Sequence, residues 1–181
     1  MNAYLDGRLA PLPVGVPAPD FQLPQVLVPT QTDALQRSRL LRLRRLGRNQ
    51  ALVLVFYPLD WEPVSREQLT LYQLYSDAFH RLGARLLGIS TDHVYSHEAF
   101  AREAQLHFPL LADFRPRGHV ARQYGVWREA LSVSARALFI LDQQRVIRFG
   151  KTYPDQLNPG VDELLTTLEE LADEDQATAR R

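Results

Sequence analysis

The sequence predicts an α/β fold in which a mixed central sheet is flanked by helices. Unbroken apolar runs, typical of strands covered on both faces, occur at ALVLVFY (51–57) and RLLGIS (85–90). Between them lies a segment with apolar residues three or four positions apart, which is typical of a helix. Two further apolar runs, 136–142 and 145–150, are joined by a tight polar turn and predict an antiparallel hairpin. The sheet should therefore contain both parallel and antiparallel strands.

The first half of the chain predicts a βαβ unit after an extended beginning. Residues 1–14 should form an extended, proline-containing segment. After strand 51–57, a helix over 65–82 should end at Gly83, which suits the left-handed position after a helix. Strand 85–90 then completes the unit. The apolar face of the predicted helix consists of Leu69, Tyr72, Tyr75, Phe79 and Leu82.

The second half continues the alternation. STD at 90–92 offers N-caps for a helix that extends through Ala104. A short strand over 107–113 and a glycine-bounded helix over 118–125 precede the hairpin. From Gly160 the chain should form a final amphipathic helix, and the polar tail 173–181 should fray. A single domain over 15–172 accounts for these elements. The apolar face of the final helix consists of Leu164, Leu165, Leu168 and Leu171.

Composition excludes several classes of function. The 181 residues include no cysteine, which rules out disulfides, thiolate metal sites and thiol chemistry. The formal net charge is zero, which argues against a general nucleic-acid binder. The longest apolar run, 51–57, is far shorter than the roughly 18 residues needed to span a bilayer. Because no signal-peptide pattern is visible either, we expect a cytoplasmic protein that does not bind membranes, and we assign it no cofactor.

Two histidines raise the question of a metal site. His93 and His97 stand four positions apart on a predicted helix and could present two imidazoles on one face. The sequence lacks the glutamate that H-E-x-x-H places between them. Histidines near a helix start are more often exposed or capping, so we expect no metal site here.

An arginine-rich stretch, RSRLLRLRRLGR, covers residues 37–48. Basic amphipathic segments of this kind can contact anionic lipid or nucleic acid. The zero net charge instead favours a solvated surface element that leads into the strand at 51–57.

Six stretches, in order along most of the chain, resemble one protein family. They are GVPAPDFQL (15–23), VFYPLDW (55–61), LLGISTD (86–92), FPLLAD (108–113), ARQYGVW (121–127) and RALFILD (136–142). The sequence resembles the peroxiredoxins of the alkyl hydroperoxide reductase and thiol-specific antioxidant family, near their bacterioferritin comigratory and one-cysteine branches. This resemblance implies a thioredoxin-like fold of the peroxiredoxin type, a family of thiol-dependent peroxidases, and a homodimer.

The family motif Pro-x-x-x-Thr-x-x-Cys, with a distant arginine, shows what has changed at the site. Pro58 and Arg136 match the proline and the arginine, whereas Glu62 replaces the threonine and Ser65 replaces the peroxidatic cysteine. Gln68 stands where the family often has glutamate. A thiolate cleaves peroxide, and a helix N-terminus and a guanidinium stabilise that thiolate. A serine hydroxyl neither ionises there nor forms a sulfenic acid, so peroxidase turnover should be absent.

Glu62 and Ser65 need roles other than those of the residues they replace. A carboxylate would repel a thiolate, and we hypothesise that Glu62 pairs with Arg136 and supplies the missing negative charge. Ser65-x-x-Gln68 fits a capping box, with Ser65 as the N-cap. A serine hydrolase is a weaker alternative, because no base is placed near Ser65 and GISTD (88–92) lacks the second glycine of G-x-S-x-G.

The sequence therefore predicts a peroxiredoxin-family protein without peroxidase activity. It would act through binding of a small ligand or protein at the former peroxide pocket, or through its dimer surface. Tyr57, Trp61 and Trp127 stand near the loops that form dimer contacts in the family, and exposure at a dimer surface or packing inside the monomer would explain them equally well. The alternative is a one-cysteine hydroperoxide reductase whose catalytic cysteine has been substituted by Ser65, and the gene's codon 65 would distinguish the two.

Overall fold

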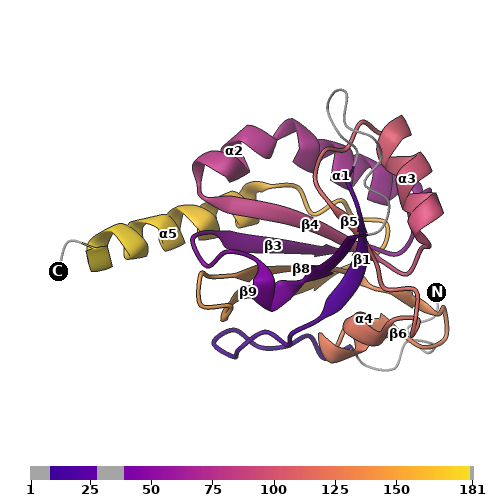
Figure 1. Cartoon of the computed structure of the whole chain (residues 1–181), viewed down its shortest axis with the longest axis horizontal. Helices are drawn as coiled ribbons and strands as arrows, with labels where there is room; N and C mark the ends of the chain where they lie inside the picture. Colours follow the sequence, from indigo (N-terminus) through magenta and orange to yellow (C-terminus); the bar gives the residue numbers. More distant parts are fainter. Residues whose placement is uncertain (1–8, 28–38, 180–181) are drawn as a thin grey trace.

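A computed structural model describes residues 9–27 and 39–179, which fold around one mixed sheet (Figure 1). The strand order of this seven-stranded sheet is β2-β1-β5-β4-β3-β8-β9. β3, β4 and β5 are mutually parallel, and each remaining pair of neighbours is antiparallel. The mixed α/β sheet predicted from the sequence is confirmed. The strands are β1 (Gln22–Val26), β2 (Arg39–Arg42), β3 (Ala51–Phe56), β4 (Ala84–Ser90), β5 (Leu110–Ala112), β8 (Arg136–Leu141) and β9 (Ile147–Tyr153).

Helices cover both faces of this sheet. Those of one face pack on a core cluster that includes Val53, Val55, Tyr72 and Phe100. On the other face α4 and the N-terminal segment pack on a cluster that includes Phe56 and Tyr124. Because successive β3 side chains point to opposite faces and all are buried, the unbroken apolar run reflects two covered faces. The helices are α1 (Pro63–Leu74), α2 (Ser76–Arg81), α3 (Val94–Glu103), α4 (His119–Gln123) and α5 (Asp162–Ala179), with a 3-10 turn η1 (Leu43–Arg45) and a small ribbon of β6 (Trp127–Arg128) and β7 (Val133–Ser134).

The predicted helix over 65–82 is two helices. α1 ends at Leu74 and α2 begins at Ser76, so Tyr75 lies at the break and is 41% exposed instead of facing the core. The change of direction lets Phe79 pack edge-on against Tyr72, with ring centroids 6.1 Å apart. The helical periodicity was therefore right for the buried positions on either side of the break, but wrong for Tyr75.

Other boundaries also differ from the expectations. The strand expected over 107–113 is limited to β5, and α3 is capped by His93 and not by the STD sequence. The polar residues expected to fray from 173 onward are helical as far as Ala179. This end of α5 is held by the hairpin, because Arg148 pairs with Glu174 at 2.6 Å and Gln143 donates to Asp175 at 2.6 Å.

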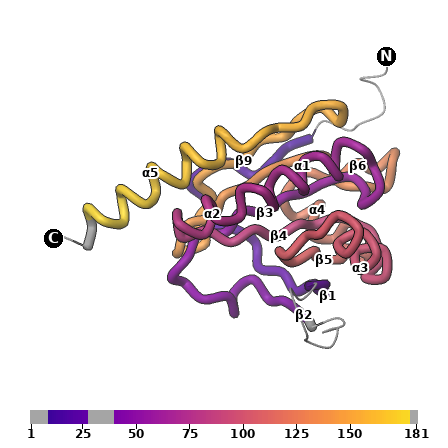
Figure 2. The backbone as a smooth tube through the Cα atoms, turned by 90° about the horizontal axis from the view of Figure 1, so that it is seen from above, coloured from indigo at the N-terminus to yellow at the C-terminus, as the bar shows by residue number. Residues whose placement is uncertain are grey.

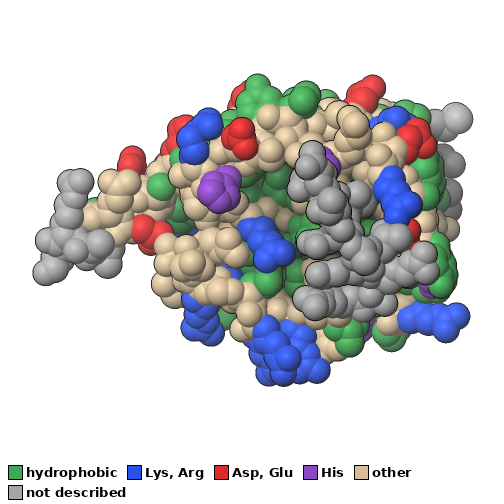
Figure 3. All heavy atoms as spheres, turned by 45° about the horizontal axis from the view of Figure 1, so that its top comes forward, with side chains coloured by type: hydrophobic (Ala, Val, Ile, Leu, Met, Phe, Trp, Pro, Cys, Tyr) green, Lys and Arg blue, Asp and Glu red, His purple; other side chains and the backbone are tan. Residues whose placement is uncertain are grey.

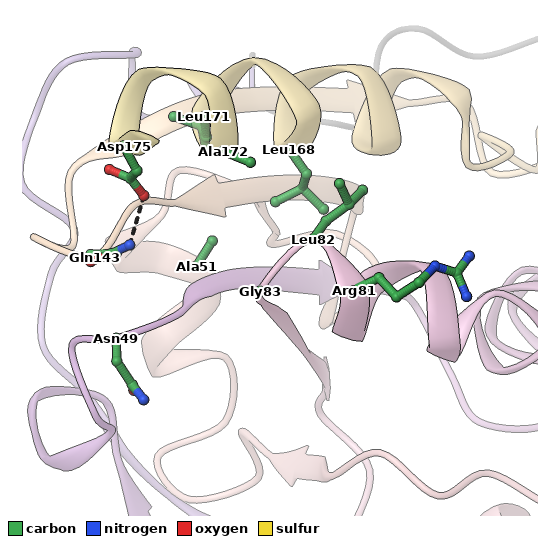
Figure 4. Close-up of a pocket in the computed structure, with 10 residues that line it drawn as sticks. All are labelled: Asn49, Ala51, Arg81, Leu82, Gly83, Gln143, Leu168, Leu171, Ala172 and Asp175. Atoms are coloured by element: carbon green, nitrogen blue, oxygen red, sulfur yellow. Dashed lines mark hydrogen bonds between the residues drawn. The ribbon is translucent and has the colours of Figure 1, made fainter. Parts of the chain in front are cut away.

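α5 packs along one face and then extends past the sheet, as both Figure 1 and Figure 2 show. Leu168, Leu171 and Ala172 face Ala51 and Leu82 across a cavity of 240 Å³ (Figure 4). The hydrogen bond between Gln143 and Asp175 closes one end of this cavity. The helix is therefore joined to the body by apolar packing and by contacts with the β8–β9 hairpin.

The arginine-rich stretch is described from residue 39 onward, and its first two residues lie outside the described part. Two of its leucines enter the core, where Leu41 and Leu43 are 5% and 2% exposed, whereas Leu40 is 58% exposed. Arg44 pairs with Asp20 at 3.0 Å. The described part is thus β2 and η1 at the edge of the sheet, which accounts for its alternating pattern. Within the described residues, no helix is both long enough and apolar enough to cross a membrane.

Two glycines with the same backbone conformation provide a matched test of local packing. Gly83 and Gly125 have φ of 66° and 70°, where an L side chain costs roughly 1 kcal/mol. A Cβ at Gly83 would meet nothing within 4 Å, but at Gly125 it would lie 1.8 Å from the carbonyl oxygen of Ala10. We expect Gly83→Ala to cost about 1 kcal/mol and Gly125→Ala about 3 kcal/mol, measured by urea unfolding. Equal losses would show that the N-terminal segment does not pack against Gly125 in solution.

A closed carboxylate and guanidinium site

The site begins in the loop that follows β3 at the carboxyl end of the parallel strands. Pro58 is buried at the start of this loop, and Pro63 occupies the first position of α1. Proline suits that position because its missing N–H would have no helical partner there. The loop therefore delivers Glu62 directly to the N-terminus of α1.

Glu62 is the N-cap of α1, and not Ser65. Its carboxylate accepts hydrogen bonds from the amides of Val64 at 3.0 Å and Ser65 at 2.7 Å. The Ser65 hydroxyl donates to the same carboxylate at 2.7 Å. The capping-box prediction was wrong because Glu62 reaches the amides first and leaves Ser65 inside the first turn. Gln68 accordingly does not reach back to the helix start.

Arg136, the first residue of β8, is fully buried against this carboxylate. Its guanidinium donates to Glu62 at 2.8 Å, to the Gln68 side chain at 2.6 Å and to the Asp155 carbonyl at 3.0 Å. A longer contact of 3.4 Å joins it to the Ser65 hydroxyl. The predicted pairing of Glu62 with Arg136 is therefore confirmed, across 74 positions of sequence.

Two neighbours complete the surroundings of Arg136. Gln68, unassigned from the sequence beyond the capping box, donates its side-chain amide to the Tyr72 hydroxyl at 3.1 Å. Asp155, whose carbonyl holds Arg136, is itself paired through its carboxylate with Arg128. The loop after β9 is thus tied to the site from two sides. Asp155 was not predicted as a site residue, because loop residues carry no periodic pattern.

Burial and hydrogen bonding act in opposite directions on Glu62. Burial raises the pKa of its carboxyl group. Hydrogen bonds from Ser65, Val64 and Arg136 lower this pKa by more than burial raises it, so the net pKa lies below the ordinary value. The anionic form is therefore the stable one. A helix N-terminus and a guanidinium both attract anions, and here the protein's own carboxylate satisfies both.

The site is closed around Ser65. Ser65, Gln68 and Arg136 are each 0% exposed, and the Glu62 side chain is 27% exposed. A solute must displace the Glu62 carboxylate before it can contact the Ser65 hydroxyl. Glu62 also makes a poor general base for Ser65, since its pKa is lowered and it already accepts from several donors. The geometry therefore gives no support to a serine hydrolase.

A second polar cluster, which was not predicted from the sequence, lies in the interior against the loop that follows β3. Tyr57 donates its hydroxyl to Asp60 at 2.8 Å, and Nδ1 of His97 lies 2.8 Å from the same carboxylate. All three side chains are 0% exposed. Burial and the Asp60 charge raise the pKa of the Tyr57 hydroxyl, which keeps it a donor. Asp92 accepts from the Asp60 amide at 3.0 Å and so links the loop to the end of β4.

The histidines are not paired as the metal hypothesis required. His93 lies outside α3 and accepts from the Tyr95 amide at 3.4 Å, whereas His97 is buried on Asp60. The expectation of an exposed or capping residue therefore holds for His93 and is wrong for His97. Across the described ranges, no group of three or more His, Cys, Asp or Glu side chains is arranged to hold a metal ion.

The three aromatic residues near the expected dimer loops also differ in their exposure. Trp61 is 50% exposed and donates to Ser96 at 3.2 Å. Trp127 is half-buried beneath the Arg122 guanidinium, which lies 4.2 Å from its ring. Tyr57 is fully buried, because its hydroxyl finds a partner in Asp60 and its ring packs in the core.

Comparison with known proteins agrees with this fold. Residues 14–149 match the model of the AhpC/TSA family. Peroxiredoxin 2 of Thermoplasma acidophilum is 34% identical over 131 residues, which cover 68% of this chain and 64% of that protein. Alkyl hydroperoxide reductase E of Mycobacterium tuberculosis is 31% identical over 140 residues, which cover 77% of this chain and 85% of that protein.

A solved structure gives the same result at the level of the fold. The reduced 2-Cys peroxiredoxin of Plasmodium vivax superimposes with a TM-score of 0.79 at 25% sequence identity, covering 92% of this chain and 85% of that one. The thioredoxin-like architecture of the peroxiredoxin type is therefore confirmed. By its sequence match and its fold, the chain belongs to the AhpC/TSA family of peroxiredoxins.

Proposed function

We propose that this peroxiredoxin-family protein has no thiol-peroxidase activity and acts through binding. One observation carries the proposal: in a chain without cysteine, Glu62 occupies the anion site formed by the start of α1 and Arg136. A thiolate reduces hydrogen peroxide by taking one oxygen to form a sulfenic acid, while the second oxygen leaves as water. Ser65 has no sulfur to oxidise, and Glu62 covers its hydroxyl.

The exposed residues beside this site suggest where a partner would bind. Leu59 and Trp61 are 40% and 50% exposed in the loop that carries Glu62. Tyr95 is 68% exposed and adjoins Ser96, the hydrogen-bond partner of Trp61. Large apolar side chains in an exposed group are typical of interaction surfaces. We assign this surface to a protein partner in the cytoplasm, first of all a second copy of the chain. Sedimentation of the purified chain tests this, and a monomer at all concentrations contradicts the homodimer.

Peroxide consumption with dithiothreitol as reductant tests the loss of activity. We expect the wild-type protein and Ser65→Ala to be equally inactive. Ser65→Cys should give a weakly reactive thiol, because the neighbouring Glu62 charge opposes its ionisation. In Ser65→Cys/Glu62→Thr that charge is absent while Arg136 remains, and the rate at neutral pH should rise about tenfold above the single variant.

The variants also separate the parts of the proposal. Threonine is itself a good N-cap, so the double variant should keep α1 intact, which circular dichroism checks. Catalytic turnover by the wild-type chain would overturn the proposal. Equal rates for the single and double cysteine variants would show that Glu62 does not control the chemistry at position 65.

A further inference from the structure

A second cavity lies at the opposite end of the sheet from Ser65. It has a volume of 280 Å³ and is bordered by the start of β4, by α2 and by the residues that precede β5. β5 is shorter than β4, and their pairing begins with Gly88 opposite Leu110. In the described part of the chain, no strand pairs with residues 84–87 on that side of β4. The space next to this end of β4 forms the cavity.

The walls of this cavity are apolar, but its edge is basic. Phe79, Leu86 and Phe108 form buried parts of the wall. Arg85, His80 and His107 also line it, and none of its lining residues is acidic. Figure 3 views a face on which hydrophobic side chains show in a hollow, with basic and histidine side chains on one side of it. A ligand that matches this lining combines an apolar body with a negative charge.

Arg85 is the residue of the cavity that favours a negatively charged ligand. Its guanidinium is half-buried, and burial lowers its pKa. Among the described residues, no hydrogen-bond acceptor or carboxylate is found on it. A partly desolvated cation with no acceptor among the described residues is unfavourable there, and an anion that reaches it would remove the penalty. The planar guanidinium matches a carboxylate through two parallel hydrogen bonds.

We propose that this cavity binds a small carboxylate with an apolar body, such as an aromatic or short aliphatic acid. The apolar part would contact Phe79 and Phe108, and the carboxylate would bind Arg85. The volume lies near the lower limit of ligand pockets, about 300 Å³, so the ligand is small. The apolar walls disfavour a free inorganic anion, which would lose its hydration without gaining contacts.

The cavity beneath α5 does not share this chemistry. Its acidic residue, Asp175, already accepts from Gln143. In Figure 4 the Arg81 side chain points away from the leucine-lined space. Arg81 is therefore a suitable control, since it is an exposed arginine near the Arg85 cavity but outside its lining.

Titration of the full chain with phenylacetate and with its neutral analogue phenylacetamide tests the proposal, followed by amide chemical shifts. We expect saturable shifts at Phe79, Arg85 and Phe108. Phenylacetate should bind at least about tenfold more tightly than phenylacetamide, which corresponds to about 1.4 kcal/mol. Arg85→Gln should abolish this preference, whereas Arg81→Gln should retain it.

The contrary outcomes are equally specific. The proposal would be overturned by equal affinity for the acid and the amide, or by an unchanged preference for the acid in Arg85→Gln. Shifts confined to other surfaces, or the absence of saturable shifts, would overturn it as well. The wild-type spectra locate the ligand by themselves, so the test does not depend on the folding of Arg85→Gln.

Discussion

Replacing Arg136 with methionine is expected to lower the free energy of unfolding by about 3 kcal/mol at pH 7. Methionine fills much of the same volume, so the loss comes mainly from polar groups that remain without partners. Glu62, Gln68 and the Asp155 carbonyl all accept from the guanidinium. Urea unfolding followed by circular dichroism measures the change. A loss below about 1 kcal/mol would show that water replaces the guanidinium, and that the site is open in solution.

A matched ion pair elsewhere separates burial from charge. Arg66 and Glu103 pair at 2.6 Å, with side chains that are 46% and 53% exposed. A double-mutant cycle on this surface pair should give a coupling of about 0.5 kcal/mol. The cycle of Glu62→Gln with Arg136→Met should give a larger value, about 1.5 kcal/mol.

The pH dependence of the Glu62–Arg136 coupling follows from the lowered pKa of Glu62. A carboxyl group whose pKa is lowered by folding stabilises the protein fully above its unfolded pKa, about 4.3. That contribution disappears as the pH falls through the lowered folded value. The coupling should therefore be intact at pH 6 and diminished well below pH 4. A constant coupling over this range would contradict the assignment of Glu62 as the anion.

Asp60→Ala is expected to destabilise the protein by about 3 kcal/mol or more. The substitution leaves the Tyr57 hydroxyl and Nδ1 of His97 without their shared acceptor in a region that water does not reach. Thermal and urea unfolding measure the loss. Asp60→Asn keeps an acceptor oxygen of similar size and should cost clearly less than Asp60→Ala.

An exposed acidic residue serves as the control for Asp60. Glu67 lies on the outer face of α1, and Glu67→Ala should change the stability by about 0.5 kcal/mol or less. If Asp60→Ala were equally mild, the polar cluster beneath the loop would not be a structural support. The position of Glu62 would then have to depend on the α1 cap and on Arg136.

The fold was accessible from the sequence because its signals are local. Apolar runs, helical spacing and the hairpin turn act over a few residues, and they predicted β3, β4, β5, β8, β9 and the helices, but not the strands β1 and β2 on the far side of β5. The break at Tyr75 was not accessible, because helical spacing on either side of a one-residue interruption still resembles one helix. The length of α5 was missed because its last turns depend on contacts with Arg148 and Gln143, which come from the hairpin.

The site was partly accessible through the family motif. Its spacing placed Pro58, Glu62 and Ser65 at the start of a helix, and charge complementarity indicated Arg136 as the partner of Glu62. The choice of N-cap depended on a competition between two side chains, which a residue preference alone does not decide. The pairing of His97 with Asp60 joins residues 37 positions apart, and no local pattern reveals which histidine the fold encloses.

The serine in the first turn of α1 has a consequence for the behaviour of the protein under oxidative stress. Outside residue 1, the chain carries no sulfur atom, so oxidants that modify thiols and thioethers find no target in the folded domain. The end of the sheet that carries Glu62 and Trp61 therefore undergoes no sulfur oxidation in reducing or oxidising surroundings. A molecule that recognises this end would therefore meet no sulfenic acid, disulfide or methionine sulfoxide there, before or after an oxidative burst.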